Sequence, residues 1–392
     1  MRHITDEERR ARIARRHALA PDFRAADPET ATRAMTVLHA TEAPTVYLSL
    51  FARVETLKVS AVDAVLYEDR SLVKQLAMRR TLFVFPRDLL PAALGSASAR
   101  VASQNGPRLA KEVEAAGLAT NGTAWLDAAR RAVVSRLANG DELSARELAE
   151  SVPEIGGRIE MAPGKKYGGE FPIAPRVLAQ LGAEGLIVRG RNQGHWRIAR
   201  PQWTSLKAWL GEVVEPWSER AGYAELVRRW LGTFGPGTVE DLRWWLGSTV
   251  SGVKRALIDV SAVEVSLDGD VPGWVLPDDV QPVAFDTPWA ALLPVMDPTT
   301  MGWKGRAFYL GPHAPELFDT NGNAGTTAWW KGRVVGCWVQ DQTGVVRLRL
   351  LEDPGRTATK ALQIEADRLT DWLEGIRVST VYPSSAMRSA VS

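Results

Sequence analysis

Apolar and polar positions in the first ninety residues alternate between helical spacing and a short strand. Apolar residues recur every 3.6 positions over 32–41 and predict a helix there. Pro44 suits the first turn of a second helix. A β-rich apolar run at 81–85 follows the basic pair Arg79–Arg80. Helices followed by a strand are the order of a winged helix.

The same order recurs more clearly over residues 121–201. Ser144 with Glu147 three residues later forms a capping box before an apolar run, which marks a helix start. Two apolar runs near the end of the segment flank Asn192 and Gly194, which are residues typical of hairpin connections. The predicted elements are helices over 124–138, 144–151 and 172–182, and wing strands over 185–190 and 196–200.

Residues 222–286 look like a third copy of this order. The connection between its two predicted wing strands is acidic, with Asp268 and Asp270 on either side of Gly269. An acidic wing does not suit contact with phosphates, so this copy is interpreted as structural.

Beyond residue 289 the pattern changes to short apolar runs at hairpin spacing, which indicates a small β-barrel or sandwich closed by a helix over 360–374. The predicted fold class is therefore α+β, with tandem winged-helix (helix-turn-helix) units and a C-terminal small β-barrel-like domain. The predicted divisions are 1–110, 120–203, 204–286 and 287–380, in that order.

Composition places the chain among soluble globular proteins, with 45% hydrophobic and 24% charged residues in 392. The charged N-terminus shows no signal peptide, and the lone Cys337 excludes an intrachain disulfide, so a cytoplasmic location is expected. The five histidines are scattered, which gives no metal-ligand spacing.

A net charge of +2 means that a nucleic-acid-binding surface must gather its cations on one face. The predicted wing of the second copy is the strongest basic candidate. A Gly-rich loop at 156–171 adds two lysines near its tip. The candidate DNA-binding residues of these two segments are Lys165, Lys166, Arg189, Arg191, His195, Arg197 and Arg200.

The segment 32–54 resembles the active-site segment of the winged-helix DNA glycosylases of the AlkZ/YcaQ family. The resemblance rests on Tyr47-Leu48 and Ala52-Arg53, and on the order of elements along the chain. Where the family usually has Gln-x-Gln or Gln-x-Asp, this chain has His39 and Thr41. The segment 292–297, followed by 304–306, is similar to the family's C-terminal domain.

The resemblance implies a monofunctional DNA glycosylase that excises alkylated purines or unhooks interstrand crosslinks. It would act as a monomer on damaged double-stranded DNA, without a cofactor. The two motif positions, His39 and Thr41, would hold the attacking water, because a neutral imidazole and a hydroxyl each accept a hydrogen bond. Arg53 would contact a phosphate.

Each of these roles has a structural alternative. His39 can cap a helix end, Thr41 can be a local turn residue, and Arg53 can pair with a carboxylate such as Asp63. At the level of the whole protein, the alternative is a winged-helix DNA-binding protein without catalysis, either a regulator or a lesion-sensing paralogue.

Overall fold

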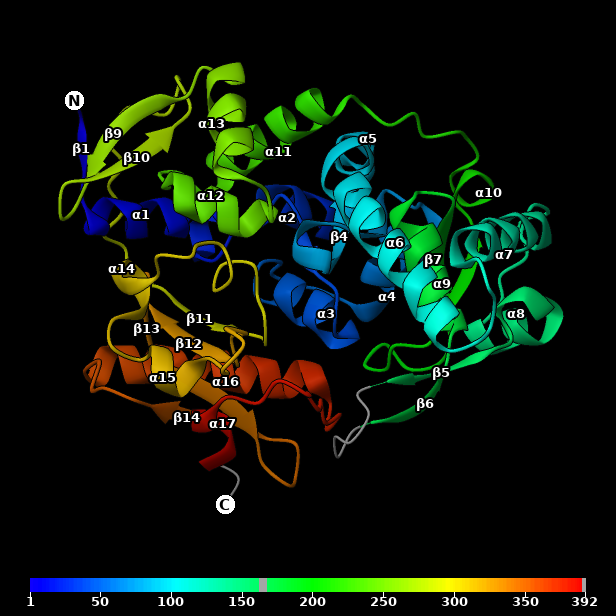
Figure 1. The fold of residues 1–392 in the computed structure, drawn as a ribbon. Helices are drawn as coiled ribbons and strands as arrows, with labels where there is room; N and C mark the ends of the chain where they lie inside the picture. The colour runs from blue at the N-terminus through cyan, green and yellow to red at the C-terminus, as the bar shows by residue number, and fades with distance from the viewer. Residues whose placement is uncertain (162–167, 390–392) are drawn as a thin grey trace.

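The computed structural model describes residues 1–161 and 168–389 (Figure 1). It consists of helices and small separate sheets, as the sequence predicts. Three units of helices and a hairpin follow one another along the chain, before a four-stranded sheet and a long helix near the C-terminus. Within the described ranges, no helix is both long and apolar enough to cross a membrane.

The first unit has the element order of a winged helix: helix, short strand, helix, helix and hairpin. Asp27 caps its first helix, because the Asp27 side chain accepts a hydrogen bond from Thr30 N–H and Pro28 occupies the first turn. The elements are α2 (Pro28–Ala34), β2 (Leu38–His39), α3 (Ala43–Phe51), α4 (Val59–Asp63), η2 (Ala64–Glu68), β3 (Leu72–Leu76) and β4 (Leu82–Pro86).

The prediction of one helix over 32–41 is wrong. α2 already ends at Ala34, and Thr36 has a left-handed φ of 64° that breaks the helix. β2 follows at once, with His39 paired to Phe83 of β4. Backbone pairing with β4 therefore overrides the helical spacing of the apolar residues in this segment. The run predicted as a strand at 81–85 corresponds to β4.

The second unit encloses a hydrophobic core of its own, built from residues between Leu109 and Trp203. Its second helix begins with the predicted capping box, since Ser144 and Glu147 exchange side-chain hydrogen bonds with each other's backbone N–H. The elements are α6 (Ala99–Ala115), which leads in from the first unit, α7 (Gly122–Arg136), α8 (Ala145–Ser151), β5 (Arg158–Met161), β6 (Gly169–Pro172), α9 (Ala174–Ala183), β7 (Ile187–Asn192) and β8 (Pro201–Ser205).

The second strand of this unit's wing lies later in the chain than predicted. β7 pairs with β8, and residues 193–200 form the connection between them. Trp196 in that connection is buried, with its ring centroid 5.2 Å from that of Tyr47 and 5.6 Å from that of Trp372. Burial of this large side chain against other parts of the molecule takes the segment away from strand pairing.

The first residues of the chain add a strand to the sheet of the third unit. β1 (His3–Ile4) pairs in parallel with β9 of this unit, so the N-terminus lies beside a segment more than 250 residues later (Figure 1). α1 (Asp6–Arg16) follows β1. The elements of the unit are α11 (Glu219–Phe234), α12 (Val239–Leu246), α13 (Val250–Asp259), β9 (Val263–Leu267) and β10 (Val271–Val275), preceded by α10 (Leu206–Leu210).

The C-terminal sheet is a single open sheet, whereas the sequence pattern predicted a small β-barrel or sandwich. Its antiparallel strands run in the order β11 (Ala290–Leu293), β12 (Thr327–Trp330), β13 (Arg333–Gln340) and β14 (Val346–Leu350). α16 (Arg356–Leu373) packs against the sheet and buries its apolar side. The short helices α14 (Ala307–Leu310), α15 (Ala314–Leu317) and α17 (Ser385–Ser389) complete this region.

A fully buried ion pair joins the first unit to the C-terminal sheet. Arg53, just after α3, donates from Nη2 to Asp297 Oδ1 (2.7 Å) and from Nη1 to Asp297 Oδ2 (2.8 Å). Both side chains are 0% exposed. Ser49 Oγ and Thr299 N–H also donate to Asp297, and Thr299 Oγ1 accepts from Arg53.

This arrangement corrects the interpretation of Arg53 as a phosphate contact, because a guanidinium without exposed surface cannot reach DNA. The carboxylate that it pairs with is Asp297 and not Asp63. Asp63 accepts a hydrogen bond of 2.5 Å from the Tyr47 hydroxyl instead. The two segments that carry the family resemblance, around Arg53 and around Asp297, therefore meet in the core.

Replacing Arg53 by Met should lower the free energy of unfolding by about 3–5 kcal/mol, because it leaves the Asp297 charge buried without its counter-ion. Urea unfolding measures this. The control is Arg146→Met, whose pair with Glu150 is largely exposed, so its loss should change the free energy of unfolding far less than the loss of Arg53. Equal losses of stability in the two variants would contradict the structural role of the buried pair.

Candidate active site

His39 lies on β2 with its side chain inside the protein. The residue is 4% exposed, and its ring centroid is 4.8 Å from that of Phe83 in an edge-on contact. Neither ring nitrogen has a hydrogen-bond partner among the described residues. Buried polar atoms are rarely left in this state, so His39 calls for an explanation other than packing.

His17 provides a direct comparison within the same chain. It is also fully buried, but its Nδ1 lies 2.9 Å from Thr299 Oγ1 and its Nε2 lies 3.1 Å from the Thr233 carbonyl oxygen. The carbonyl can only accept, so Nε2 carries the proton and Nδ1 accepts from the hydroxyl. His17 is thus a satisfied core histidine, whereas His39 is not.

Burial lowers the pKa of His39 to about 3, and the positive charge of Arg79 lowers it in the same direction. The imidazole is therefore neutral throughout the physiological range. In that form one ring nitrogen donates and the other accepts, which suits the orientation of a small polar molecule more than the removal of a proton.

Thr41 lies at the surface beside His39. Ala40 N–H still donates to Leu82 O, but the chain bends at Thr41 and Glu42 before α3 begins at Ala43. Thr41 is exposed, and its hydroxyl makes no hydrogen bond to a described residue. The two motif residues therefore lie at different depths, with His39 buried and Thr41 exposed.

The turn between β3 and β4 brings arginines to this region. Arg79 and Arg80 both have left-handed φ angles, 53° and 57°, which cost energy in residues other than glycine. The Arg79 guanidinium lies over the Trp244 ring, 3.9 Å from its centroid, and Arg306 lies over the same ring at 5.0 Å. The sequence showed the Arg79–Arg80 pair but did not reveal that it lies near His39.

A hollow of about 160 Å³ beside this turn is lined by Arg79, Arg80 and Arg100 together with Gln104 and Leu246. None of the three arginines forms an ion pair with a carboxylate in the described part of the chain. Unpaired guanidinium groups that converge on a hollow are suited to bind phosphate.

The predicted basic wing is only partly available to a ligand. Arg189 packs over the Trp203 ring, with 5.0 Å between the guanidinium carbon and the ring centroid, and burial lowers its pKa. Arg197 is exposed, but its Nη1 donates to the Arg377 carbonyl (2.8 Å). The other exposed candidates on this segment are Arg191, His195 and Arg200. Lys165 and Lys166 lie outside the described residues.

Comparison with known proteins identifies the family. The family model for "DNA glycosylase AlkZ-like" matches residues 32–372. The chain belongs to the AlkZ-like DNA glycosylase family. The Streptomyces sahachiroi DNA glycosylase AlkZ has a similar structure, with a TM-score of 0.74 at 19% identity over 95% of this chain and 98% of that one. No curated protein matches the sequence significantly.

The matched range of the family model includes both segments of the buried ion pair, His39 and the β3–β4 turn. α1 and the segment 377–388 lie outside the matched range. Membership thus confirms the family resemblance found in the sequence, and the similar solved structure confirms the fold class.

The two buried histidines should make the free energy of unfolding fall as the pH decreases below about 6.5. Each has a pKa of about 3 in the folded protein, against about 6.5 unfolded. The unfolded chain therefore binds more protons between these values, and each histidine costs up to about 1.4 kcal/mol per pH unit there. Urea unfolding at pH 7.5, 6, 5 and 4.5 measures the slope.

His17→Leu and His39→Leu should each reduce this slope, but their effects at pH 7.5 should differ. His17→Leu leaves the Thr299 hydroxyl without its acceptor and the Thr233 carbonyl without its donor from His17, and should cost about 1–3 kcal/mol. His39→Leu removes an unpaired polar group, so stability should hold or rise. A decrease at pH 7.5 as large as that of His17→Leu would mean that His39 is structural.

Proposed function

We propose that this protein is a monofunctional DNA glycosylase that hydrolyses the N-glycosidic bond of alkylated purines in double-stranded DNA, including purines in interstrand crosslinks. Membership of the AlkZ-like family supports glycosylase activity. The observation that carries the proposal is a buried, neutral His39 whose two ring nitrogens have no partner among the described residues.

An N-alkylated purine carries positive charge and leaves readily, so the enzyme mainly has to position a water against the sugar. The neutral His39 would accept a hydrogen bond from that water and hold it in place. A pKa of about 3 makes the imidazole a weak base, so its contribution is orientation. As the N-glycosidic bond breaks, the cationic alkylpurine would leave as a neutral base, and the water, now bonded to the sugar carbon, would release its proton to solvent.

Thr41 would act at the protein surface, where its hydroxyl, which no described residue engages, can hydrogen-bond the sugar or the same water. In family terms, His39 and Thr41 stand at the positions of the usual Gln-x-Gln or Gln-x-Asp pair. Neither brings a carboxylate, so the positive charge that develops on the sugar would be stabilised by the phosphates of the bound DNA.

Two basic surfaces are candidates for holding those phosphates. The first is the hollow lined by Arg79, Arg80 and Arg100, which lies next to the turn that approaches His39. The second is the wing of the second unit with Arg191, Arg197 and Arg200, which the sequence favours. Electrostatic contact of this kind supplies affinity without sequence preference.

The second candidate function is a DNA-binding protein without catalysis, a regulator or a lesion-sensing relative. The specific observation in its favour is the deep burial of His39, which keeps its nitrogens from direct contact with a substrate as large as DNA. The two functions differ in whether base is released.

Wild-type protein should release N7-methylguanine from a duplex that carries it, which alkali then reveals as strand breaks at abasic sites. His39→Leu should lower the single-turnover rate by ~10²-fold or more. Thr41→Val should lower it by ~10-fold, the effect of removing one hydrogen bond. The wild-type rate should stay level from pH 8 to pH 5, because His39 remains neutral there.

His3→Leu is the matched control, since His3 is exposed and pairs with Asp268 far along the chain. Its rate should equal that of wild type. Equal rates for wild type and His39→Leu would remove His39 from the mechanism. No release by the wild type on any alkylated duplex would favour the function without catalysis.

Salt titration of duplex binding should tell which basic surface faces DNA. Removing one arginine that binds a phosphate should reduce the slope of log affinity against log salt by about 0.9. The double variants Arg80→Ala/Arg100→Ala and Arg191→Ala/Arg200→Ala should therefore each lower it by about 1.8. Arg356→Ala/Lys360→Ala, at the exposed start of α16, is the control. An unchanged slope in either test variant would exclude that surface.

A further inference from the structure

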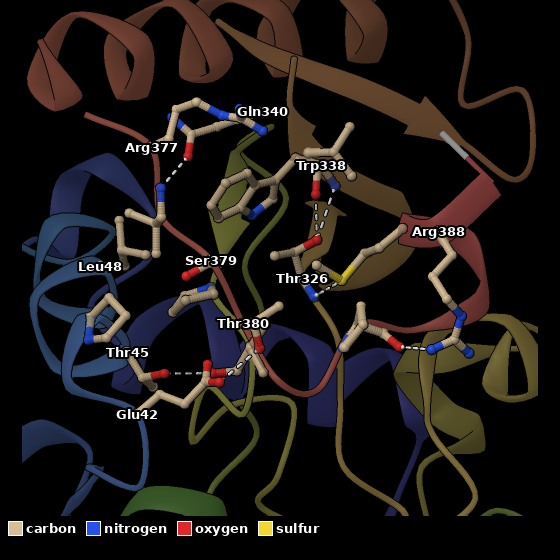
Figure 2. A pocket seen from close by; sticks show the side chains of 17 residues that line it. Glu42, Thr45, Leu48, Thr326, Trp338, Gln340, Arg377, Ser379, Thr380 and Arg388 are labelled. Carbon is tan, nitrogen blue, oxygen red and sulfur yellow. Dashed lines mark hydrogen bonds between the residues drawn. The ribbon is translucent and has the colours of Figure 1, made fainter. Parts of the chain in front are cut away.

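A cavity of about 400 Å³ lies between the start of α3 and the C-terminal sheet, apart from His39 (Figure 2). α3 provides Pro44, Thr45 and Leu48, and β13 provides Trp338 and Gln340. The segment 377–388, called the strap, follows α16 and lines another side of the cavity. This volume is within the range of small-molecule sites, roughly 300–1,000 Å³.

The walls of the cavity are mostly apolar, and the polar groups of Trp338 and Gln340 are already used. Trp338 Nε1 donates to the Leu293 carbonyl (2.8 Å), which leaves the indole ring for contact with a ligand. Gln340 Nε2 donates to the carbonyl oxygens of Gly344 and Ile376, and its Oε1 accepts from Val378 N–H. Figure 2 shows the Trp338 indole among the lining side chains, between Leu48 and Thr326. A planar aromatic ligand suits such walls.

Glu42 is the acidic group of the cavity, and one of its oxygens is free. Oε1 accepts hydrogen bonds from Thr380 Oγ1 (2.9 Å) and Val381 N–H (2.8 Å). Oε2 accepts none from the described residues, and Glu42 has no ion-pair partner among them. Burial raises the pKa of this carboxyl. A half-buried carboxylate oxygen without a donor is suited to an N–H group of a ligand.

Two arginines stand at separate ends of the same cavity (Figure 2). Arg377 and Arg388 are both exposed, and neither pairs with a carboxylate in the described part of the chain. Arg388 Nη1 donates to the Pro383 carbonyl (2.6 Å), which leaves further N–H groups of this guanidinium. Guanidinium groups at the rim of an apolar cavity are suited to a phosphate.

We propose that the cavity binds a purine nucleotide that carries an exocyclic amine. The base lies against Trp338, the amine donates to Glu42 Oε2, and the phosphate faces Arg377 or Arg388. A bicyclic base fills the apolar volume better than a pyrimidine does. The nucleotide can be free in solution or turned out of a duplex, and the two sources share this chemistry.

The test is calorimetric titration of the full chain with AMP and with IMP, in which a carbonyl oxygen replaces the amine. AMP should bind one to one, and IMP at least ~10-fold more weakly, because its oxygen faces the carboxylate. Glu42→Gln should abolish the preference, since an amide can donate as well as accept. This readout compares two ligands on one variant, so a general decrease in stability cannot imitate it.

Arg377→Ala/Arg388→Ala should weaken AMP at least ~10-fold and leave adenosine unchanged, whereas the control Arg356→Ala, outside the cavity, should bind AMP like wild type. A second arm compares duplexes with one unpaired adenine or one unpaired hypoxanthine. A Glu42-dependent preference with AMP supports a free nucleotide as the ligand, and one with the duplex supports an extruded base. If neither arm shows that preference, the proposal is wrong.

Discussion

The buried pair between Arg53 and Asp297 fixes the geometry on which the rest of the molecule depends. Neither side chain has exposed surface, and the guanidinium donates to both oxygens of the carboxylate. This bidentate geometry fixes the position of α3 against the turn after β11. Thr45 strengthens the same junction by donating to the Val295 carbonyl (3.1 Å). Because α3 begins directly after Thr41 and Glu42, this junction also sets where the corner after β2 lies.

The same network reaches the N-terminal helix through Thr299. The Thr299 hydroxyl accepts from Arg53 and donates to His17, whose other nitrogen donates to the Thr233 carbonyl of α11. The first unit, the third unit and the C-terminal sheet thus share polar contacts within one continuous hydrophobic core, while the second unit has a separate core. Other buried atoms, such as Arg53 Nε, also lack a partner among the described residues, but His39 has both of its ring nitrogens in this state, in contrast to His17. Buried polar groups of this kind can mark functional sites.

Much of the fold could be predicted from local patterns. The capping box at Ser144 and Glu147, the strand after Arg80 and the helix-and-hairpin order all depend on neighbours a few residues apart, which a sequence displays. β2 could not be predicted, because its strand form depends on β4, more than 40 residues later. The connection at 193–200 was assigned to a strand because nothing local reveals that Trp196 packs against Tyr47 and Trp372.

The candidate site, like the fold, has features that the sequence reveals and features that only the tertiary structure reveals. The motif positions His39 and Thr41 follow from the sequence resemblance, but the burial of one and the exposure of the other are tertiary facts. Arg53 is a cation like any other in the sequence, and only the fold shows that it faces Asp297. Arg79 and Arg100 lie 21 residues apart and meet only because the β3–β4 turn lies against α6.

The central claim is that His39 is a neutral imidazole, without a hydrogen-bond partner among the described residues, that becomes engaged when damaged DNA binds. Nitrogen NMR of protein with ¹⁵N-labelled histidine tests it directly, with assignments from His17→Leu and His39→Leu. The His39 ring should stay neutral from pH 8 to pH 4.5, and a duplex with a non-hydrolysable alkylpurine analogue should shift its nitrogen resonances while those of His17 stay in place. Titration of His39 near pH 6.5, or resonances that do not respond to this duplex, would contradict the account.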